Sequence, residues 1–312
     1  MTTRAAIAPP LFRFPSLTTT VPKEFVHRSA VAEVMLTDWR RKSDSDFEVT
    51  AQWPRGHSFF SSIDDRHDPL LVAETIRQAG TLLAHAEFGV PLGHQFLMWD
   101  LDFAVEPDQL LVGGVPAALD IDITCTDIRR RGGHLTGMHY RAVIRRDGRT
   151  AATGSATYTC TTPAVYRRLR AGRGVVGGRA ALALTAPASP QSVGRTSPKD
   201  VVLTPLGKPS SWQLRADTRH PVLFDHPVDH VPGMVLLEAA RQAAAAVLER
   251  PAFSPSAISS RFSRYAELDS PCMIGARRLP DTDDGTEQVL VTGHQEGEAV
   301  FSSTVVAPAT AR

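Results

Sequence analysis

The chain has 312 residues, of which 42% are hydrophobic and 21% charged, and its formal net charge is +1. At about 150 residues per domain, this length predicts two domains. The balanced charge argues against a nucleic-acid-binding protein, and no apolar run reaches the ~18 to 20 residues that span a bilayer. The first residues also lack a signal-peptide core, so we expect a cytoplasmic protein with no nucleic-acid or membrane partner.

The first half follows a short extension, residues 1–24, and reads as strands around one helix. Residues 46–53 alternate like a half-buried strand. Residues 70–86 are apolar almost all the way round, which predicts a buried helix. A meander follows, in which Asp147-Gly148 is a hairpin signal. Its four predicted strands cover residues 96–105, 117–127, 135–146 and 150–160.

A segment rich in Gly, Ala, Ser and Pro, residues 163–199, separates the halves and is predicted to be a linker. Its basic run at 166–170 is either a solvated surface or a docking patch for an acidic carrier protein or a phosphate-bearing substrate. Three scattered cysteines, Cys125, Cys160 and Cys272, have no zinc or disulfide spacing and are predicted to be small buried residues.

The second half repeats the order of the first. A strand at 211–217 precedes a helix at 235–248, and four strands follow. They are predicted at 260–268, 272–279, 288–294 and 299–306. One antiparallel sheet around one buried helix is the hotdog fold, so the chain is predicted to be an α+β double hotdog, with domains at 25–162 and 200–312. Pairing the halves edge to edge would place both helices on one side of a continuous sheet, with ligand sites between the halves.

Each predicted helix carries the same polar triplet on its apolar surface. The triplets are Glu74, Arg77 and Gln78 in the first helix and Glu238, Arg241 and Gln242 in the second. Residues at i, i+3 and i+4 share one helix face, and burying a carboxylate with a guanidinium is costly. The duplication therefore marks either a site or a pair that orders each core.

Several segments resemble the A-factor biosynthesis family of actinomycete γ-butyrolactone synthases. They cover residues 67–74, 151–154, 165–168, 229–242, 261–265, 270–272 and 291–295. The resemblance implies an acyltransferase that joins a β-ketoacyl group, carried as a thioester of acyl carrier protein or coenzyme A, to a hydroxyl of dihydroxyacetone phosphate. The phosphorylated ester can then cyclise toward a signalling lactone. No cofactor and no metal are expected.

The glutamates are the predicted general bases. Glu238 resembles the catalytic carboxylate of hotdog dehydratases, and apolar burial is expected to raise its pKa into a useful range; Glu74 is its equivalent in the first half. Arg77 and Arg241 are predicted either to hold the substrate phosphate or to orient these carboxylates. Gln78 and Gln242 either satisfy backbone groups or position the thioester oxygen.

The start of the second helix supplies further candidates. His226 and His230 are both predicted catalytic residues, with a simple loop position as the alternative. Gly233, after Pro232, would expose backbone N–H groups to a carbonyl oxygen or a phosphate. Asp68, before Pro69, is predicted to cap the first helix. These features favour the second copy, at Glu238, Arg241 and Gln242, as the chemical centre.

Two other functions remain open at this level. One is a hotdog dehydratase or thioesterase acting on carrier-bound acyl chains, and the other is a non-catalytic protein that binds a lactone. No nucleophile elbow, P-loop or zinc-protease motif is present, which favours direct transfer without an acyl-enzyme. The oligomeric state is open, with a homodimer as one option.

Overall fold

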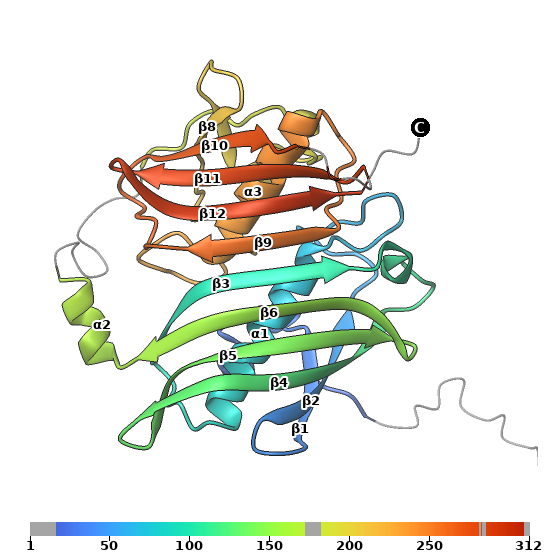
Figure 1. Cartoon of the computed structure of the whole chain (residues 1–312), viewed down its shortest axis with the longest axis vertical. Coiled ribbons are helices and arrows are strands. Elements are labelled where there is room, and N and C mark those ends of the chain that lie inside the picture. Colours follow the sequence, from blue (N-terminus) through green and yellow to red (C-terminus); the bar gives the residue numbers. More distant parts are fainter. Residues whose placement is uncertain (1–16, 172–181, 281, 283–284, 309–312) are drawn as a thin grey trace, which may run out of the picture.

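The computed structural model describes residues 17–171, 182–280, 282 and 285–308. Within them, one continuous antiparallel sheet runs through both halves of the chain in the order β1-β2-β4-β5-β6-β3-β9-β12-β11-β10-β8-β7. Helices α1 and α3 lie side by side behind this sheet, on the same face (Figure 1). The predicted double hotdog is confirmed.

The described part of the first half contains three short 3-10 helices, six strands and the long helix α1. Its 3-10 helices η1 and η2 cover Lys23–Val26 and Val31–Glu33, and a third, η3, covers Pro107–Leu110. The other elements are β1 (Leu36–Arg41), β2 (Asp46–Trp53), α1 (Leu70–Ala86), β3 (Gln95–Val105), β4 (Ala117–Arg131), β5 (His134–Arg146) and β6 (Arg149–Thr161).

The second half repeats this arrangement after the short helix α2, Pro163–Leu169. Its 3-10 helices η4 and η5 cover Pro190–Val193 and Pro198–Asp200. The other elements are β7 (Leu203–Pro205), β8 (Ser211–Leu214), α3 (Gly233–Leu248), β9 (Ala257–Phe262), β10 (Cys272–Arg278), β11 (Glu287–Gln295) and β12 (Glu298–Ala307).

The two halves meet where strand β3 pairs with strand β9. Their register runs from Asp100 opposite Arg261 to Ala104 opposite Ala257. Across this seam, Asp102 accepts hydrogen bonds from Ser259 Oγ at 2.7 Å and from Arg261 Nη1 at 2.8 Å. Each half thereby covers the open strand edge of the other, which would otherwise be free to pair with another chain.

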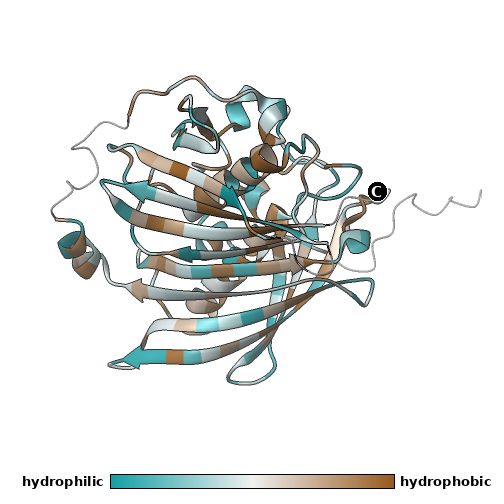
Figure 2. Cartoon of the chain, turned by 45° about the horizontal axis from the view of Figure 1, so that its top comes forward, coloured by the Kyte–Doolittle hydropathy of each residue, from teal (hydrophilic) through white to brown (hydrophobic). Residues whose placement is uncertain are grey.

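The core lies between the sheet and the two helices. Along the strands, hydrophilic and hydrophobic residues alternate (Figure 2), and the apolar side chains of the inner face pack on α1 and α3. Helix α1 approaches the sheet closely at Gly80, where an added Cβ would lie 2.4 Å from the Tyr140 hydroxyl oxygen. That hydroxyl donates a hydrogen bond to the Ile76 carbonyl at 2.8 Å. The absence of a side chain at Gly80 therefore allows α1 to pack directly against the Tyr140 ring.

The prediction of α1 matches its observed bounds, and most predicted strands are correct within two or three residues. Two strands differ more: β4 continues to Arg131, and β9 ends at Phe262. After β9 the chain passes the start of α3, where Val231 N–H donates to Ala266 O at 2.8 Å. Strands β1 and β7 and helix α2 were missed; all three are short. The three cysteines are buried and free, as predicted. In the described ranges, none of the helices has the length and apolar character needed to cross a membrane.

The predicted linker includes residues that repeat the start of the first half. Val21 N–H donates to Leu36 O at 3.0 Å, and Ala188 N–H donates to Leu203 O at 2.9 Å in the same way. This correspondence favours a second domain that begins near residue 188. The predicted domain boundaries stay a prediction, and residues 1–16 of the extension and 172–181 of the linker lie outside the described residues.

Candidate active site

Glu238, on α3, is fully buried, and two guanidiniums and an amide hold its carboxylate. Arg195 donates Nε and Nη2 to it at 2.8 and 2.6 Å, and Arg241 donates Nε and Nη2 at 3.1 and 2.9 Å. Burial by itself would raise the pKa of Glu238, but the charges of Arg195 and Arg241 lower it to about 2. The expected rise is therefore wrong, because a carboxylate saturated by cations is a weak proton acceptor.

Glu74, on α1, has the same surroundings. Arg77 donates Nε and Nη2 to its carboxylate at 2.9 and 2.7 Å, Arg28 donates Nε at 2.9 Å, and Gln78 donates its amide at 2.6 Å. Burial again opposes ionisation, and the charges of Arg28 and Arg77 again lower the pKa to about 2. These contacts support the structural role for both glutamates; their predicted catalytic role has no support from this geometry.

Gln78 and Gln242 complete the two clusters by satisfying backbone groups. Gln78 Oε1 accepts the N–H of Met35 at 2.9 Å, and its amide donates to Glu33 O at 2.7 Å. In the second half, Gln242 Oε1 accepts the N–H of Val202 at 3.0 Å and its amide donates to Asp200 O at 2.8 Å. This arrangement corresponds to the first of the two roles predicted for these glutamines.

The sequence reasoning missed Arg28 and Arg195, which tie the halves together. Arg195 Nη1 donates to Phe59 O of the first half at 2.8 Å, and Arg28 Nη1 donates to Val222 O of the second half at 3.2 Å. Both arginines lie just after a 3-10 helix, η1 or η4. Arg195 was hidden in the predicted linker; aligning the two 3-10 helices would have revealed the pair.

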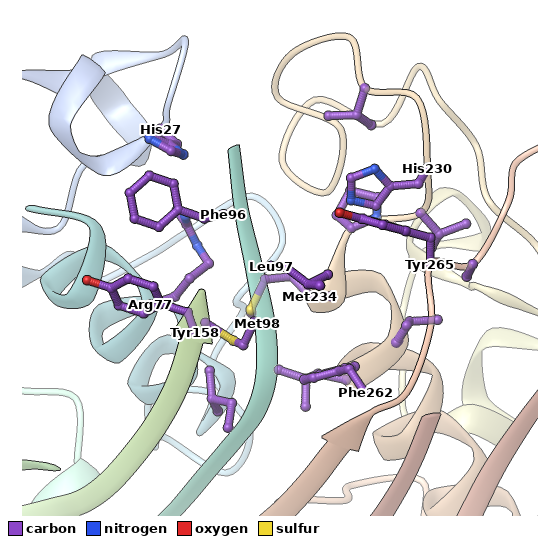
Figure 3. Close-up of a pocket in the computed structure, with 18 of the residues that line it drawn as sticks. His27, Arg77, Phe96, Leu97, Met98, Tyr158, His230, Met234, Phe262 and Tyr265 are labelled. Atoms are coloured by element: carbon purple, nitrogen blue, oxygen red, sulfur yellow. The ribbon is translucent and has the colours of Figure 1, made fainter. Parts of the chain in front are cut away.

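A cavity of about 250 Å³ lies between the halves, bounded by α1, β3, β9 and the first turn of α3. Figure 3 shows its interior, with His27 and His230 on opposite sides and Phe96, Leu97 and Met98 of β3 between them. Most of the residues that line it are apolar. A wider outer chamber of about 580 Å³ adjoins it. The residues common to both are His27, Arg28, Gln95, His226, Val228 and His230.

The cavity separates the predicted site residues into two groups. Those that line it are Arg77, His226, His230 and Gly233; those that do not are Glu74, Gln78, Glu238, Arg241 and Gln242. The Arg77 side chain is 18% exposed, whereas that of Arg241 is 0% exposed. The cavity is therefore lined by the arginine of the first helix and by the N-terminus of the second. The preference for the second copy as the chemical centre stays a prediction.

His230 lies at the mouth of the cavity in a pair with Asp229. Its Nδ1 lies 2.7 Å from Asp229 Oδ1, and the same carboxylate accepts the Tyr166 hydroxyl at 2.7 Å and Arg170 Nε at 3.2 Å. The contacts to Asp229 hold its pKa far below the usual range, against the effect of burial. Since the ionised carboxylate only accepts, Nδ1 carries the proton, and Nε2 is left as the proton acceptor.

His27 lies across the cavity from His230 and is paired with His85. His85 Nδ1 lies 2.7 Å from Val90 O, so it donates there, and His85 Nε2 accepts from His27 Nε2 at 2.8 Å. Burial, followed by the charge of Arg77, lowers the pKa of His27 to about 3. His27 is therefore neutral at pH 7, with Nδ1 as an acceptor. It has φ 53°, in the left-handed region, where the second repeat has Gly194 at φ 69°.

The two helices differ most at their first residues. Asp68 is fully buried, and its Oδ1 accepts the N–H of Leu70, the first residue of α1, at 2.9 Å. The N-cap residue itself is Pro69, so the predicted cap lies one residue too early in the chain. Helix α3 begins after Pro232 with no side-chain cap, and Gly233 and Met234 line the cavity. The N-terminus of α1 is thus closed by a carboxylate, and that of α3 opens onto the cavity.

These features define a hotdog-fold protein with a cavity between its two repeats. A solved structure agrees with the fold: the 12:0-ACP thioesterase from Umbellularia californica superposes with a TM-score of 0.50. It is 12% identical, over 84% of this chain and 93% of that one. At that identity, the likeness concerns the fold alone.

The family follows from closer relatives. The model of the A-factor biosynthesis hotdog domain matches residues 13–162 and 179–310, one segment for each half. A protein of Streptomyces virginiae is 56% identical over 92% of this chain and 97% of its own, and one of Streptomyces coelicolor is 46% identical over 93% and 92%. Both are named 2-oxo-3-(phosphooxy)propyl 3-oxoalkanoate synthase. The chain belongs to the A-factor biosynthesis family, as its motifs predicted.

Proposed function

We propose that this protein transfers a β-ketoacyl group from a thioester to the hydroxyl of dihydroxyacetone phosphate. The names of its relatives describe the ester that this reaction makes. The structural observation that supports this function best is the Asp229–His230 pair, which stands at the mouth of an apolar cavity between the repeats. A proton acceptor beside an apolar chamber suits the transfer of a fatty acyl group to a hydroxyl.

His230 is the proposed general base. Its Nε2 takes the proton of the hydroxyl as the hydroxyl oxygen bonds to the thioester carbonyl carbon; the carbon–sulfur bond then breaks, and the proton passes to the leaving thiolate. Asp229 holds the ring and stabilises the imidazolium that forms. His27 is a poorer base, since a group with a pKa of about 3 does not retain a proton at neutral pH. It is better suited to accept a hydrogen bond from the acceptor substrate.

The inner cavity is the proposed acyl site. Phe96, Leu97, Met98 and Leu101 of β3 face Leu237 of α3 and Phe262 of β9 across it. Gly233 begins α3 there, and its substitution by a larger residue would fill part of this space. The open N–H groups of Gly233 and Met234 carry the positive end of the helix dipole, which suits either the thioester oxygen or the substrate phosphate.

The outer chamber is the proposed route for the thioester arm. Its wall includes Tyr166, Arg167 and Arg170 of the segment at α2. Arg170 is bound to Glu267 at 2.6 Å, whereas Arg167 is exposed. A basic rim suits both an acidic carrier protein and the phosphates of coenzyme A. Comparing kcat/KM for the two donors, with Arg167→Glu as the variant, distinguishes them: loss with the carrier protein alone supports the carrier.

The test of the reaction uses purified protein, a β-ketoacyl thioester and dihydroxyacetone phosphate, with products followed by mass spectrometry. The phosphorylated ester, or the butenolide formed from it, is the expected product. Free acid alone would identify a thioesterase, an enoyl thioester would identify a dehydratase, and binding of a lactone without turnover would indicate a regulator. Labelling of a Ser or Cys by the thioester alone would replace direct transfer by an acyl-enzyme route.

Two further predictions remain untested. A homodimer is one expected state, and light scattering of the purified protein measures it. The cytoplasmic location is measured by fractionation of cells that produce the protein.

A further inference from the structure

The two repeats differ by one carboxylate at their equivalent helix N-termini. Asp68 and Pro232 both lie six residues before the clustered glutamate of their helix, Glu74 or Glu238. In the first half, Asp68 Oδ1 accepts the N–H of Leu70 at 2.9 Å, and its Oδ2 lies 3.4 Å from Arg195 Nη1. A negative charge therefore sits between a helix N-terminus and a guanidinium, where both partners favour it.

In the second half, the same two donors are present without that carboxylate. Arg28 is the counterpart of Arg195: each donates Nε to its glutamate and Nη1 to a carbonyl of the other half. Met234 is the counterpart of Leu70, and Pro232 has no side-chain oxygen. Arg28 and Met234 both line the cavity, and the Arg28 side chain is 8% exposed.

We propose that the phosphate of the acceptor substrate binds at this position, between the N–H of Met234 and Nη1 of Arg28. The inference rests on the proposed function, because it assigns a phosphate monoester to the cavity. Within the described residues, no hydrogen bond uses Nη1 of Arg77, which lines the same wall and adds a second guanidinium. Guanidiniums and helix N–H groups are the donors that bind phosphate best.

Nearby charges are compatible with an anion here. Asp225 lines the cavity, but its carboxylate accepts the N–H groups of Ser29 and Ala30 and does not cap α3. The Arg77 charge is felt inside the cavity, since it helps to lower the pKa of His27 after burial. A bound phosphate would oppose that effect and raise the pKa of His27.

The test places the missing carboxylate in the second half. Pro232→Asp puts Asp at an N-cap position that it favours, where its carboxylate can bind Met234 N–H and Arg28 as Asp68 does with Leu70 and Arg195. Pro232→Asn is the matched control, because Asn also caps a helix but carries no charge. Asp68→Asn is the control in the first half.

Affinity for dihydroxyacetone phosphate is measured by calorimetry without a thioester, with uncharged dihydroxyacetone as the comparison ligand. Pro232→Asp should weaken the phosphate ligand by about 10- to 100-fold, as expected from loss of a charge-assisted hydrogen bond. Pro232→Asn should weaken it much less, and Asp68→Asn should leave it unchanged. The unfolding temperature of Pro232→Asp should stay at or above that of the wild type.

Equal affinity in a folded Pro232→Asp variant would overturn the assignment, and so would an equal loss in the Asp and Asn variants. A lower kcat with unchanged KM and affinity for dihydroxyacetone phosphate would also overturn it, because the position would then serve the thioester oxygen. The proposed function is tested separately from the phosphate position, and it fails when the wild-type protein forms no ester. Calorimetry would still report on the phosphate position in that case.

Discussion

Each repeat contains the same kind of buried cluster, and the repeats differ at the N-terminus of the helix that carries it. In both, a glutamate binds two guanidiniums and an amide, and a guanidinium reaches across to the other half. In the first repeat, the Asp68 carboxylate accepts the N–H of Leu70 at the start of α1; in the second, the start of α3 opens onto a cavity. The comparison teaches that most of the duplicated polar residues are buried in the two clusters, whereas the proposed base and phosphate position lie where the repeats diverge.

Loss of His230 should have the largest effect on catalysis. It belongs to the second repeat alone, since Arg66 takes the corresponding place before α1. His230→Gln should lower kcat/KM by about 100- to 10,000-fold, the usual contribution of a general base, without lowering the unfolding temperature. A greater loss in His226→Gln than in His230→Gln would move the base to His226.

Glu238→Gln should mainly affect stability. It leaves Arg195 and Arg241 buried without their carboxylate, which costs about 3 to 5 kcal/mol of unfolding free energy. This expectation differs from that for the predicted general base, whose loss would act mainly on turnover. Turnover by the molecules that remain folded should persist; complete loss of turnover with unchanged stability would restore Glu238 as the base.

The pH dependence of unfolding gives a second measure of this cluster. The pKa of Glu238 is lowered to about 2 in the folded protein, so its contribution is fully present above about pH 4.5, its ordinary pKa. That contribution is lost as the pH falls from there toward 2. The Gln variant should lack this part of the acid transition.

The two helical arginines test whether the repeats are equivalent. Arg241→Gln removes a fully buried guanidinium and should cost about 3 to 5 kcal/mol of stability. Arg77→Gln should cost less, because that side chain reaches the cavity, and should raise KM for dihydroxyacetone phosphate. Urea unfolding and steady-state kinetics measure the two effects. Equal stability losses with unchanged KM would contradict the difference between the repeats.

His27 should give the smallest effect, a change in the slope of stability with pH. Because its folded pKa is about 3 and its unfolded pKa about 6.5, the unfolded chain binds a proton that the folded protein does not bind. Stability therefore falls as the pH drops below about 6.5. His27→Gln should reduce this slope by up to about 1.4 kcal/mol per pH unit between pH 6 and 4. An unchanged slope would contradict the buried neutral state of His27. Some slope should remain in the variant, because the pKa of His67 is also lowered, to about 4.

Much of the fold could be predicted from the sequence. The buried helices were visible because residues 70–86 and 235–248 are apolar on nearly every side. The strands were visible because apolar and polar residues alternate along them. The duplication was visible because the triplet Glu74, Arg77 and Gln78 recurs as Glu238, Arg241 and Gln242. The short strands β1 and β7 escaped, since three to six residues carry little periodicity.

The site was predicted less well. His226, His230 and Gly233 were predicted at the second copy and Arg77 at the first, but all four line one cavity, and Glu238 was wrongly given a raised pKa. That error came from counting burial without Arg195, which lies far away in sequence. A carboxylate's pKa depends on every charge within a few ångströms, and most of those charges come from other elements.

The sequence by itself determined the family, the two repeats, their buried helices and the polar residues within each helix, because these depend on motifs and on local periodicity. Only the tertiary structure decided which charges meet and which helix N-terminus stays open. Packing brought Arg28 and Arg195 across to the opposite repeat, and placed Asp68 against one of them. These long-range contacts lower the pKa of both glutamates, whereas Arg77, His230 and Gly233 line the cavity between the repeats.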